Sequence, residues 1–170
     1  MDLNGSKIFS KLGLNQGNHQ LEISEKSRNI TTFTTHVGLR RYKRLNFGLT
    51  CASEFFQNTI RTSLEGLEGV HNISDDIIVY GNSQEQHDSR LAAALRRLQE
   101  KGLTLNKQKC EFNKKTLEFF GYIFSENGFS ADKKKGETIK NTPAPQNASE
   151  VRSFLAMTNY VSRFIPDYST

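Results

Sequence analysis

Two adjacent carboxylates, Asp75 and Asp76, are the residues of this 170-residue chain best suited to chemistry. They lie within two short apolar arms over 70–80, so we predict that they occupy the tip of a hairpin. Held rigidly there, they could bind a divalent metal, because Mg²⁺ takes hard oxygen ligands and often only one or two protein carboxylates. A solvated turn explains the same residues, since Asp is common in turns. On the local sequence alone, both interpretations stay open.

A short basic run is the second candidate for function. It comprises Arg40, Arg41, Tyr42, Lys43 and Arg44, four cations around one aromatic ring. Such a run suits contact with a phosphate backbone, with an affinity that falls as salt rises. A solvated strand edge is the alternative, because Lys and Arg there discourage pairing with other chains. Further basic clusters over 107–115 and 133–135 favour the nucleic-acid interpretation slightly.

The composition narrows the class of protein. Lys and Arg number 23 against 18 Asp and Glu, which gives a formal net charge of +5. No apolar run approaches the roughly 20 residues that span a bilayer, so we expect no membrane insertion. Two cysteines, Cys51 and Cys110, cannot form a disulfide framework and lack zinc-site spacing. With no secretory signal visible at the start, we expect an intracellular protein, cytoplasmic or nuclear.

The elements that must position these residues follow from periodicity and capping signals. We expect strands over 19–24, 30–37 and 117–124, the hairpin over 70–80, and a tight turn at 126–128. We expect one helix after Asn46-Phe47-Gly48, capped by Thr50, and a second over 84–101 with a Ser83/Gln86 capping box. A third helix starts at Asn147 or Ser149 and ends at Pro166. This order predicts an α+β fold, an antiparallel sheet with helices on one face.

Several blocks of residues, taken together and in order, resemble the reverse transcriptase of gypsy-type long-terminal-repeat retrotransposons. They are Phe9-Ser10-Lys11-Leu12 with Gly17 and His19-Gln20; Tyr42-Lys43-Arg44-Leu45 with Phe47-Gly48-Leu49 and Phe55-Phe56-Gln57; Asp75-Asp76-Ile77; Gly102-Leu103 with Cys110-Glu111-Phe112; Phe119-Phe120-Gly121-Tyr122; and Arg152-Ser153-Phe154-Leu155 through Tyr160 and Arg163-Phe164-Ile165-Pro166. Each block alone is weakly specific, but six in family order cover essentially the whole chain. The resemblance favours metal binding at the hairpin.

The resemblance implies an RNA-directed DNA polymerase palm with a primer-grip hairpin over 1–141, a Pro-containing connector over 142–146, and the start of a thumb over 147–170. Its partners would be an RNA template, a DNA primer and deoxynucleoside triphosphates. Two Mg²⁺ (or Mn²⁺) ions would be held by Asp75, Asp76 and a carboxylate on the first palm strand. We therefore expect the Asp75–Asp76 bend to face the strand around Leu12–Leu14.

The resemblance also implies roles for other residues. Phe47 and Gly48 would lie against the incoming nucleotide, and Asn18 would stand where the family has an aromatic that excludes a ribose 2′-hydroxyl. The segment Phe120-Gly121-Tyr122 would grip the primer. The basic side chains of Arg40, Arg41, Lys43 and Arg44 would contact the nucleic-acid backbone.

Departures from the family pattern bear on activity. Gly13 stands where the family places the first-strand Asp, and Asn18 replaces the aromatic. The chain starts just before the first palm motif and stops after one thumb-like helix, so we expect the fingers and an RNase H domain to be missing. We therefore expect a polymerase by descent with impaired catalysis. The alternative is a non-catalytic remnant of the integrating element that binds nucleic acid or other proteins.

Overall fold

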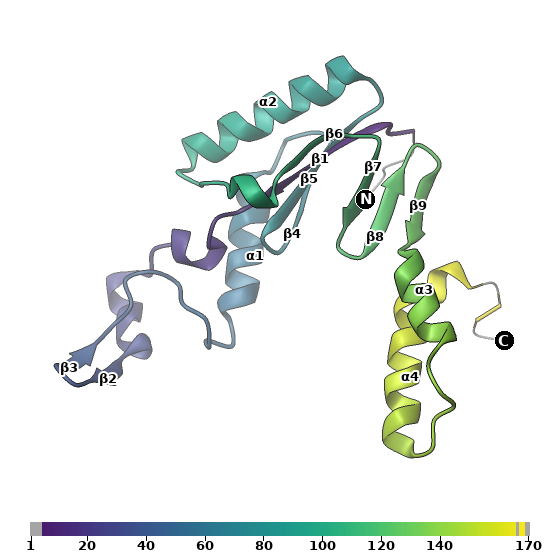
Figure 1. Ribbon diagram of the computed structural model, residues 1–170. Coiled ribbons are helices and arrows are strands. Elements are labelled where there is room, and N and C mark those ends of the chain that lie inside the picture. The colour runs from purple at the N-terminus through teal and green to yellow at the C-terminus, as the bar shows by residue number, and fades with distance from the viewer. Residues whose placement is uncertain (1–4, 166, 169–170) are drawn as a thin grey trace.

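The computed structural model describes residues 5–165 and 167–168 (Figure 1). The strands are β1 Ile8–Gly13, β2 Phe33–Thr35, β3 Gly38–Arg40, β4 Val70–Ile73, β5 Asp76–Gly81, β6 Glu111–Lys114, β7 Thr116–Phe119, β8 Tyr122–Ser125 and β9 Gly128–Ala131. The α-helices are α1 Ala52–Ser63, α2 Gln84–Glu100, α3 Lys133–Lys140 and α4 Ala148–Val161. Short 3₁₀ helices span Gly17–Gln20, Glu25–Thr31, Lys107–Lys109 and Ser162–Phe164. Among the described residues, no helix is both long and apolar enough to cross a bilayer.

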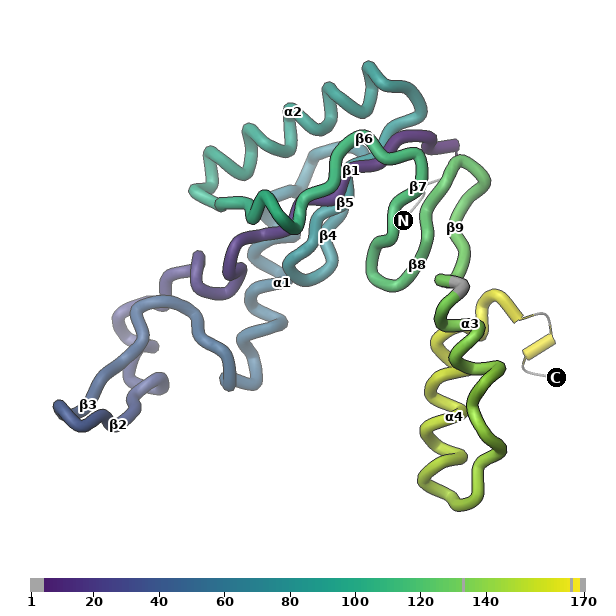
Figure 2. The backbone as a smooth tube through the Cα atoms, viewed as in Figure 1, coloured from purple at the N-terminus to yellow at the C-terminus, as the bar shows by residue number. Residues whose placement is uncertain are grey.

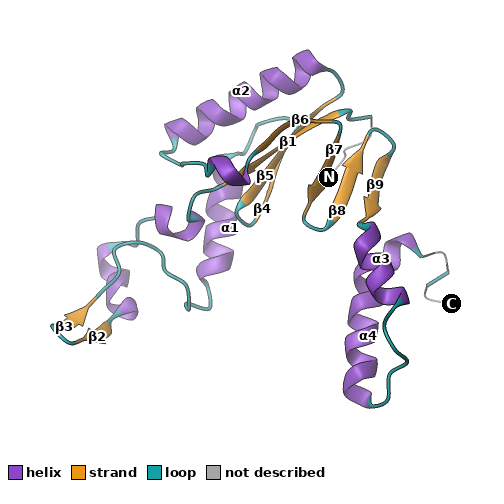
Figure 3. Ribbon diagram, in the orientation of Figure 1, coloured by secondary structure: helices purple, strands orange, loops and turns teal. Residues whose placement is uncertain are grey.

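The central sheet has the strand order β4-β5-β1-β6, and its neighbouring pairs are antiparallel. Helices α1 and α2 pack on one face, while the β7-β8-β9 sheet lies on the other side (Figure 3). Successive side chains of a strand alternate between faces. Leu12 and Val79 accordingly join the core under the helices, whereas Phe9 and Ile78 pack with apolar residues of β7 and β8. The predicted α+β class, with helices on one face of an antiparallel sheet, is confirmed.

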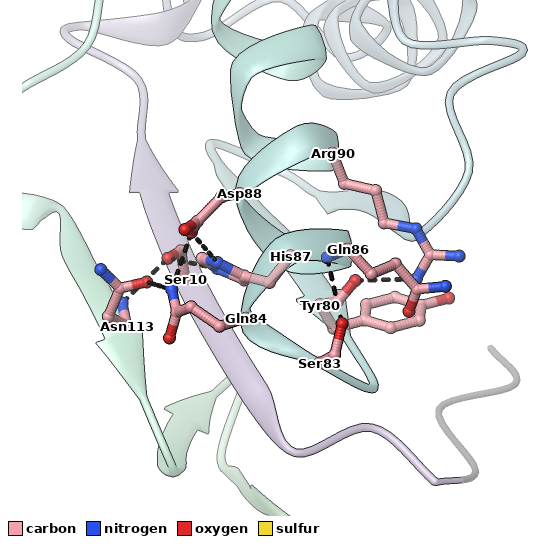
Figure 4. A network of polar contacts seen from close by, with 9 residues as sticks. All are labelled: Ser10, Tyr80, Ser83, Gln84, Gln86, His87, Asp88, Arg90 and Asn113. Atoms are coloured by element: carbon pink, nitrogen blue, oxygen red, sulfur yellow. Dashed lines mark hydrogen bonds and ion pairs between the residues drawn. The ribbon is translucent and has the colours of Figure 1, made fainter.

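A hydrogen-bond network that is buried at its centre and exposed at Asp88 ties β1, α2 and β6 together (Figure 4). The Asn113 amide donates to Ser10 Oγ at 3.1 Å, and Ser10 Oγ lies 2.9 Å from His87 Nε2. His87 Nδ1 lies 2.9 Å from Asp88 Oδ1. Every proton finds an acceptor when the Ser10 hydroxyl donates to Nε2 and Nδ1–H donates to Asp88. The bond from His87 lowers the pKa of Asp88. Because Ser10 and His87 are both 0% exposed, this network is structural.

An arm carrying β2 and β3 projects from the body of the molecule (Figure 2). The strand predicted over 19–24 is wrong, because Gly17–Gln20 is a 3₁₀ helix and Glu22 makes only an isolated bridge with Arg44. The strand predicted over 30–37 shrinks to β2. The reason is local, since the hydroxyls of Thr31 and Thr32 bond carbonyls three residues back and stabilise a turn.

The other helix and strand predictions met mixed outcomes. Helix α1 begins after Cys51 with no side-chain cap, so the predicted Thr50 cap is wrong. Helix α2 has the predicted cap, with Ser83 Oγ accepting the Gln86 amide at 3.2 Å. The single strand predicted over 117–124 is wrong, because a turn divides it into β7 and β8.

The C-terminal part is a helical hairpin of α3 and α4 (Figure 1). The Asn147 side chain caps α4 by accepting the Glu150 amide at 3.0 Å, as predicted. Helix α4 ends at Val161 and passes into the 3₁₀ helix Ser162–Phe164, while the predicted stop at Pro166 lies outside the described residues. The connector over 142–146 joins α3 to α4, and the division of the chain into palm and thumb at this point stays a prediction.

Candidate functional site

The β4–β5 hairpin turn holds the two adjacent carboxylates. Ile73 pairs with Asp76, so Ser74 and Asp75 are the two turn residues. Ser74 has a left-handed backbone with φ 53°, which is uncommon for a residue with a side chain. Gln57 of α1 holds this turn, because its Oε1 accepts the Ser74 amide at 2.6 Å and its Nε2 donates to the Asn72 carbonyl at 3.4 Å.

The bend faces the first strand. Gly13 of β1 is the antiparallel partner of Asp76, and the Leu14 amide donates to the Asp75 carbonyl at 2.9 Å. Apolar residues of both strands are buried under the helices and fix this register, because a one-residue slip would turn them to the other face. The expectation that the bend faces the strand around Leu12–Leu14 is therefore confirmed.

Gly17 makes room for the Asp75 carboxylate. A Cβ at this position would stand 2.7 Å from Asp75 Oδ1 and 2.6 Å from Phe56 Cζ. Neither distance is compatible with a real side chain. Gly17 thus lets the 3₁₀ helix Gly17–Gln20 approach the carboxylate closely.

A pocket of about 330 Å³ lies in front of the two carboxylates. Its lining is Lys11, Ile73, Ser74, Asp75, Asp76, Lys109 and Phe120. Lys11 Nζ pairs with Glu111 at 2.8 Å. The two lysines were not predicted as site residues. Strand alternation could have indicated Lys11, which shares a face of β1 with Gly13.

Lys109 occupies the space that a side chain at position 13 would need. A Cβ built on Gly13 would overlap Lys109 Cβ and would also stand 3.2 Å from Lys109 Cδ. The backbone holds Lys109 in place, since the Asn106 amide donates to the Gly13 carbonyl at 2.8 Å and the Lys109 amide to the Asn106 carbonyl at 3.0 Å. This packing closes position 13 to a third carboxylate.

The oxygen ligands available in the pocket determine how many metal ions it could hold. Within the described residues, no three His, Cys, Asp or Glu side chains gather as a metal site. Asp75 and Asp76 supply hard oxygen atoms that suit one divalent ion. Two ions that share a bridging carboxylate do not fit, because position 13 carries no ligand and Lys109 fills its space.

The turn Phe120-Gly121 reaches the carboxylates from the other sheet. Phe120 lines the pocket and is 56% exposed, while Tyr122 stacks on Tyr160 with ring centroids 5.6 Å apart. The structure thus brings Phe120 together with Asp75 and Asp76, although Phe120 comes from a different hairpin.

The predicted nucleotide-binding residues lie outside this lining. Phe47 is 72% exposed and contacts the His19 ring edge-on, with centroids 5.8 Å apart. Gly48 has a positive φ of 94°. Asn18, next to His19, is buried at 7% exposure, so its side chain presents little surface to a ligand.

The basic run lies on the projecting arm, away from the β4–β5 turn (Figure 1). Arg44 pairs with Glu22 at 3.3 Å and donates to the Gln20 carbonyl at 2.8 Å. Arg41 donates to Asn29 Oδ1. Arg40 and Lys43 are exposed. The structure therefore gathers these cations with one another but not with the carboxylate pocket.

Comparison with known proteins identifies relatives over the whole chain. The family described as reverse transcriptase (RNA-dependent DNA polymerase) matches residues 1–124. The retrovirus-related Pol polyprotein from transposon 412 of Drosophila melanogaster is 36% identical over 169 residues, which cover 98% of this chain and 14% of that protein. The transposon Tf2-3 polyprotein of Schizosaccharomyces pombe is 30% identical over 169 residues, 98% of this chain and 13% of that protein. The chain therefore spans a small part of these relatives.

Solved structures share the fold. A foamy viral protease-reverse transcriptase in complex with double-stranded DNA superposes with a TM-score of 0.87 at 23% identity, over 96% of this chain and 29% of that chain. The foamy viral protease-reverse transcriptase in complex with an RNA/DNA hybrid superposes with a TM-score of 0.77 at 23% identity, over 91% of this chain and 21% of that chain. At this identity the likeness establishes the fold.

Proposed function

This chain belongs to the reverse transcriptase (RNA-dependent DNA polymerase) family, and we propose that it is a polymerase palm that binds a template–primer duplex but is impaired in nucleotidyl transfer. Its transposon relatives support descent from a polymerase of a mobile element. The pocket beside Asp75 and Asp76 supports the proposed location of the metal and nucleotide site. The proposed partners are an RNA template, a DNA primer and deoxynucleoside triphosphates.

One observation carries the proposed impairment: Gly13 is paired with Asp76, and Lys109 fills the place of its missing side chain. A pair of metal ions that clamps the reacting oxygens contributes several kcal/mol of charge stabilisation. Each ~1.4 kcal/mol lost from transition-state stabilisation slows a reaction about tenfold. Loss of the third carboxylate is therefore expected to reduce the rate by orders of magnitude.

The remaining residues keep assignable roles in the proposal. Asp75 and Asp76 would hold a single Mg²⁺ or Mn²⁺ ion, which when bound would neutralise charge on the phosphates. Phe47 and Gly48 would contact the nucleotide, and Asn18, which is buried, would present little surface to it. Phe120, Gly121 and Tyr122 would support the primer end. The cations Arg40, Arg41, Lys43 and Arg44 would contact backbone phosphates.

A non-catalytic remnant that docks other proteins is the second candidate. The projecting arm favours it, since Ile30, Val37 and Leu39 are exposed there. Exposed large apolar side chains on one part of a molecule are typical of interaction surfaces when they form a contiguous patch. Binding to nucleic acid would then be incidental.

Primer extension on a homopolymer template with Mg²⁺ or Mn²⁺ tests the proposal. We expect the purified chain to retain the duplex without extending the primer. Template-dependent extension that Asp75→Asn abolishes and that Gly13→Asp/Lys109→Gly does not accelerate would overturn the proposed impairment. Failure to retain duplex at low salt would instead favour the protein-docking alternative.

A further inference from the structure

The turn between β7 and β8 is strained and carries a bulky residue at its apex. Phe119 pairs with Tyr122, so Phe120 and Gly121 are the two turn residues, with φ values of 51° and 76°. Such a turn usually takes Asn or Gly at its first position, because a side chain there crowds the backbone. Phe120 is also exposed, so burial of its ring does not explain its place. A strained backbone conformation at an exposed residue persists only when contacts from the surrounding structure stabilise it.

Tyr160 of α4 holds the turn. Its hydroxyl donates to the Phe120 carbonyl at 2.8 Å, and its ring stacks on Tyr122 with an interplanar angle of 7°. Lys135 Nζ of α3 lies 3.9 Å from the centre of the Tyr160 ring. A Cβ at Gly121 would overlap both Lys135 Nζ and the Tyr160 hydroxyl oxygen, so only glycine allows this close approach.

The turn that Tyr160 stabilises places Phe120 at the carboxylate pocket. Phe120 lines that pocket with Asp75 and Asp76, and its backbone carbonyl accepts a hydrogen bond from Tyr160 of α4. We propose that Tyr160 is a positioning residue, because its hydroxyl fixes the Phe120 turn. The α3–α4 hairpin, which carries Tyr160, thereby determines where Phe120 lies at the edge of the carboxylate pocket. The inference rests on the proposed function only in treating this pocket as the site.

A single tryptophan can report on the turn, because the natural chain contains none. Phe120→Trp places the only indole of the protein at the pocket wall. Tyr160→Phe in that background removes the hydroxyl and keeps the ring. Tyr168→Phe is the matched control, since the Tyr168 hydroxyl lies 2.9 Å from Thr158 Oγ1 and does not reach the turn.

The readouts are the fluorescence anisotropy of the introduced indole and its quenching by acrylamide. We expect Tyr160→Phe to lower the anisotropy and increase the quenching, with about a fivefold change in the ratio of held to released turn, as removal of one ordinary hydrogen bond produces. Tyr168→Phe should change neither. Equal behaviour of the two variants would overturn the proposal. If Phe120→Trp does not fold, hydrogen exchange at the Gly121 and Tyr122 amides gives the same comparison between Tyr160→Phe and Tyr168→Phe.

Terbium luminescence tests the link to the carboxylates separately. Tb³⁺ binds hard oxygen ligands and emits when a nearby indole transfers energy to it. In the Phe120→Trp background we expect indole-sensitised emission that Asp75→Asn/Asp76→Asn abolishes and Tyr160→Phe weakens. Emission that survives the double carboxylate change would show that other ligands hold the ion, and it would count against cation binding by Asp75 and Asp76 in the proposed function. Absence of emission from a protein that retains Tb³⁺ in equilibrium dialysis would overturn the placement of Phe120 at the pocket, while the anisotropy comparison decides on Tyr160 independently.

Discussion

Gly13, the last residue of β1, and Asp76, the first residue of β5, face each other as antiparallel partners, so only one of the two paired positions carries a carboxylate. Lys109 closes the gap, since its aliphatic side chain lies where a side chain at position 13 would be. The absence of a ligand at position 13 is therefore built into the packing of the site.

Gly13→Ala is expected to lower the free energy of unfolding by about 1–3 kcal/mol, the usual cost of overpacking. The new Cβ would overlap Lys109 Cβ. Urea unfolding of the two proteins measures the difference. Gly136→Ala is the matched control, because its Cβ meets open space within α3 and should raise stability by about 0.5–1 kcal/mol.

Replacement of Lys109 separates the clash from other effects of Gly13→Ala. Lys109→Gly removes the overlapping Cβ and should restore part of the missing stability, whereas Lys109→Ala keeps that atom and should not. A double-mutant cycle gives a coupling energy of about 0.5–3 kcal/mol for neighbouring residues that touch. Coupling near zero between Gly13→Ala and Lys109→Gly would contradict the packing described for this pair.

The hairpin could be predicted from the sequence because it is local. Two apolar arms around Ser74, Asp75 and Asp76 determine both the turn and the face of each strand. The contact between Gly13 and Lys109 could not be predicted in this way. It joins segments far apart in the chain, and it depends on how the 3₁₀ helix Lys107–Lys109 crosses β1.

Gln57→Ala is expected to destabilise the carboxylate turn. The Ser74 amide and the Asn72 carbonyl would each lose a partner, at about 0.5–1.5 kcal/mol per hydrogen bond. Ser74→Gly should recover part of that loss, because glycine adopts the positive φ without strain. Thermal unfolding measures all three proteins, and a Gln57→Ala variant as stable as the wild type would contradict the role of Gln57.

Duplex binding is expected to weaken as salt rises. Arg40→Ala/Lys43→Ala should reduce the slope of log affinity against log salt by roughly 0.9 for each phosphate that these side chains neutralise. Arg97→Ala is the control, because Arg97 donates to the Ser63 and Glu65 carbonyls in the body of the protein. Fluorescence anisotropy of a labelled template–primer measures the slope. An unchanged slope in the double variant would exclude these cations from the interface.

The stability of the protein should fall slightly as the pH drops below 6.5. Desolvation lowers the pKa of His71 from its ordinary value of 6.5, and Tyr80 Oη lies 3.1 Å from its Nε2. Between the lowered pKa and 6.5 the unfolded chain binds more protons than the folded one, so acid favours unfolding. Urea unfolding between about pH 5 and pH 8 should show a shallower decline for His71→Gln. A decline as steep as in the wild type would contradict this role.

The strand errors of the sequence prediction have a common cause. Alternation in Leu21 and Ile23, and in the apolar residues over 117–124, predicts extended chain, but it does not reveal where the backbone turns. At Phe120 the turn depends on Tyr160 in a later helix, and no local signal from an aromatic residue indicates a positive φ. By contrast, α2 has its cap and its apolar stripe within its own segment, and its bounds Gln84–Glu100 are close to the predicted 84–101.

The number of Mn²⁺ ions bound at the pocket tests the central claim most directly. Electron paramagnetic resonance titration of the wild type, Asp75→Asn/Asp76→Asn and Gly13→Asp/Lys109→Gly counts the ions that depend on these carboxylates. We predict one such ion in the wild type, none in the first variant, and tighter binding or a second ion in the last. Two ions in the wild type, both absent when Asp75 and Asp76 are changed, would contradict the claim that Gly13 and Lys109 have removed half of the metal centre.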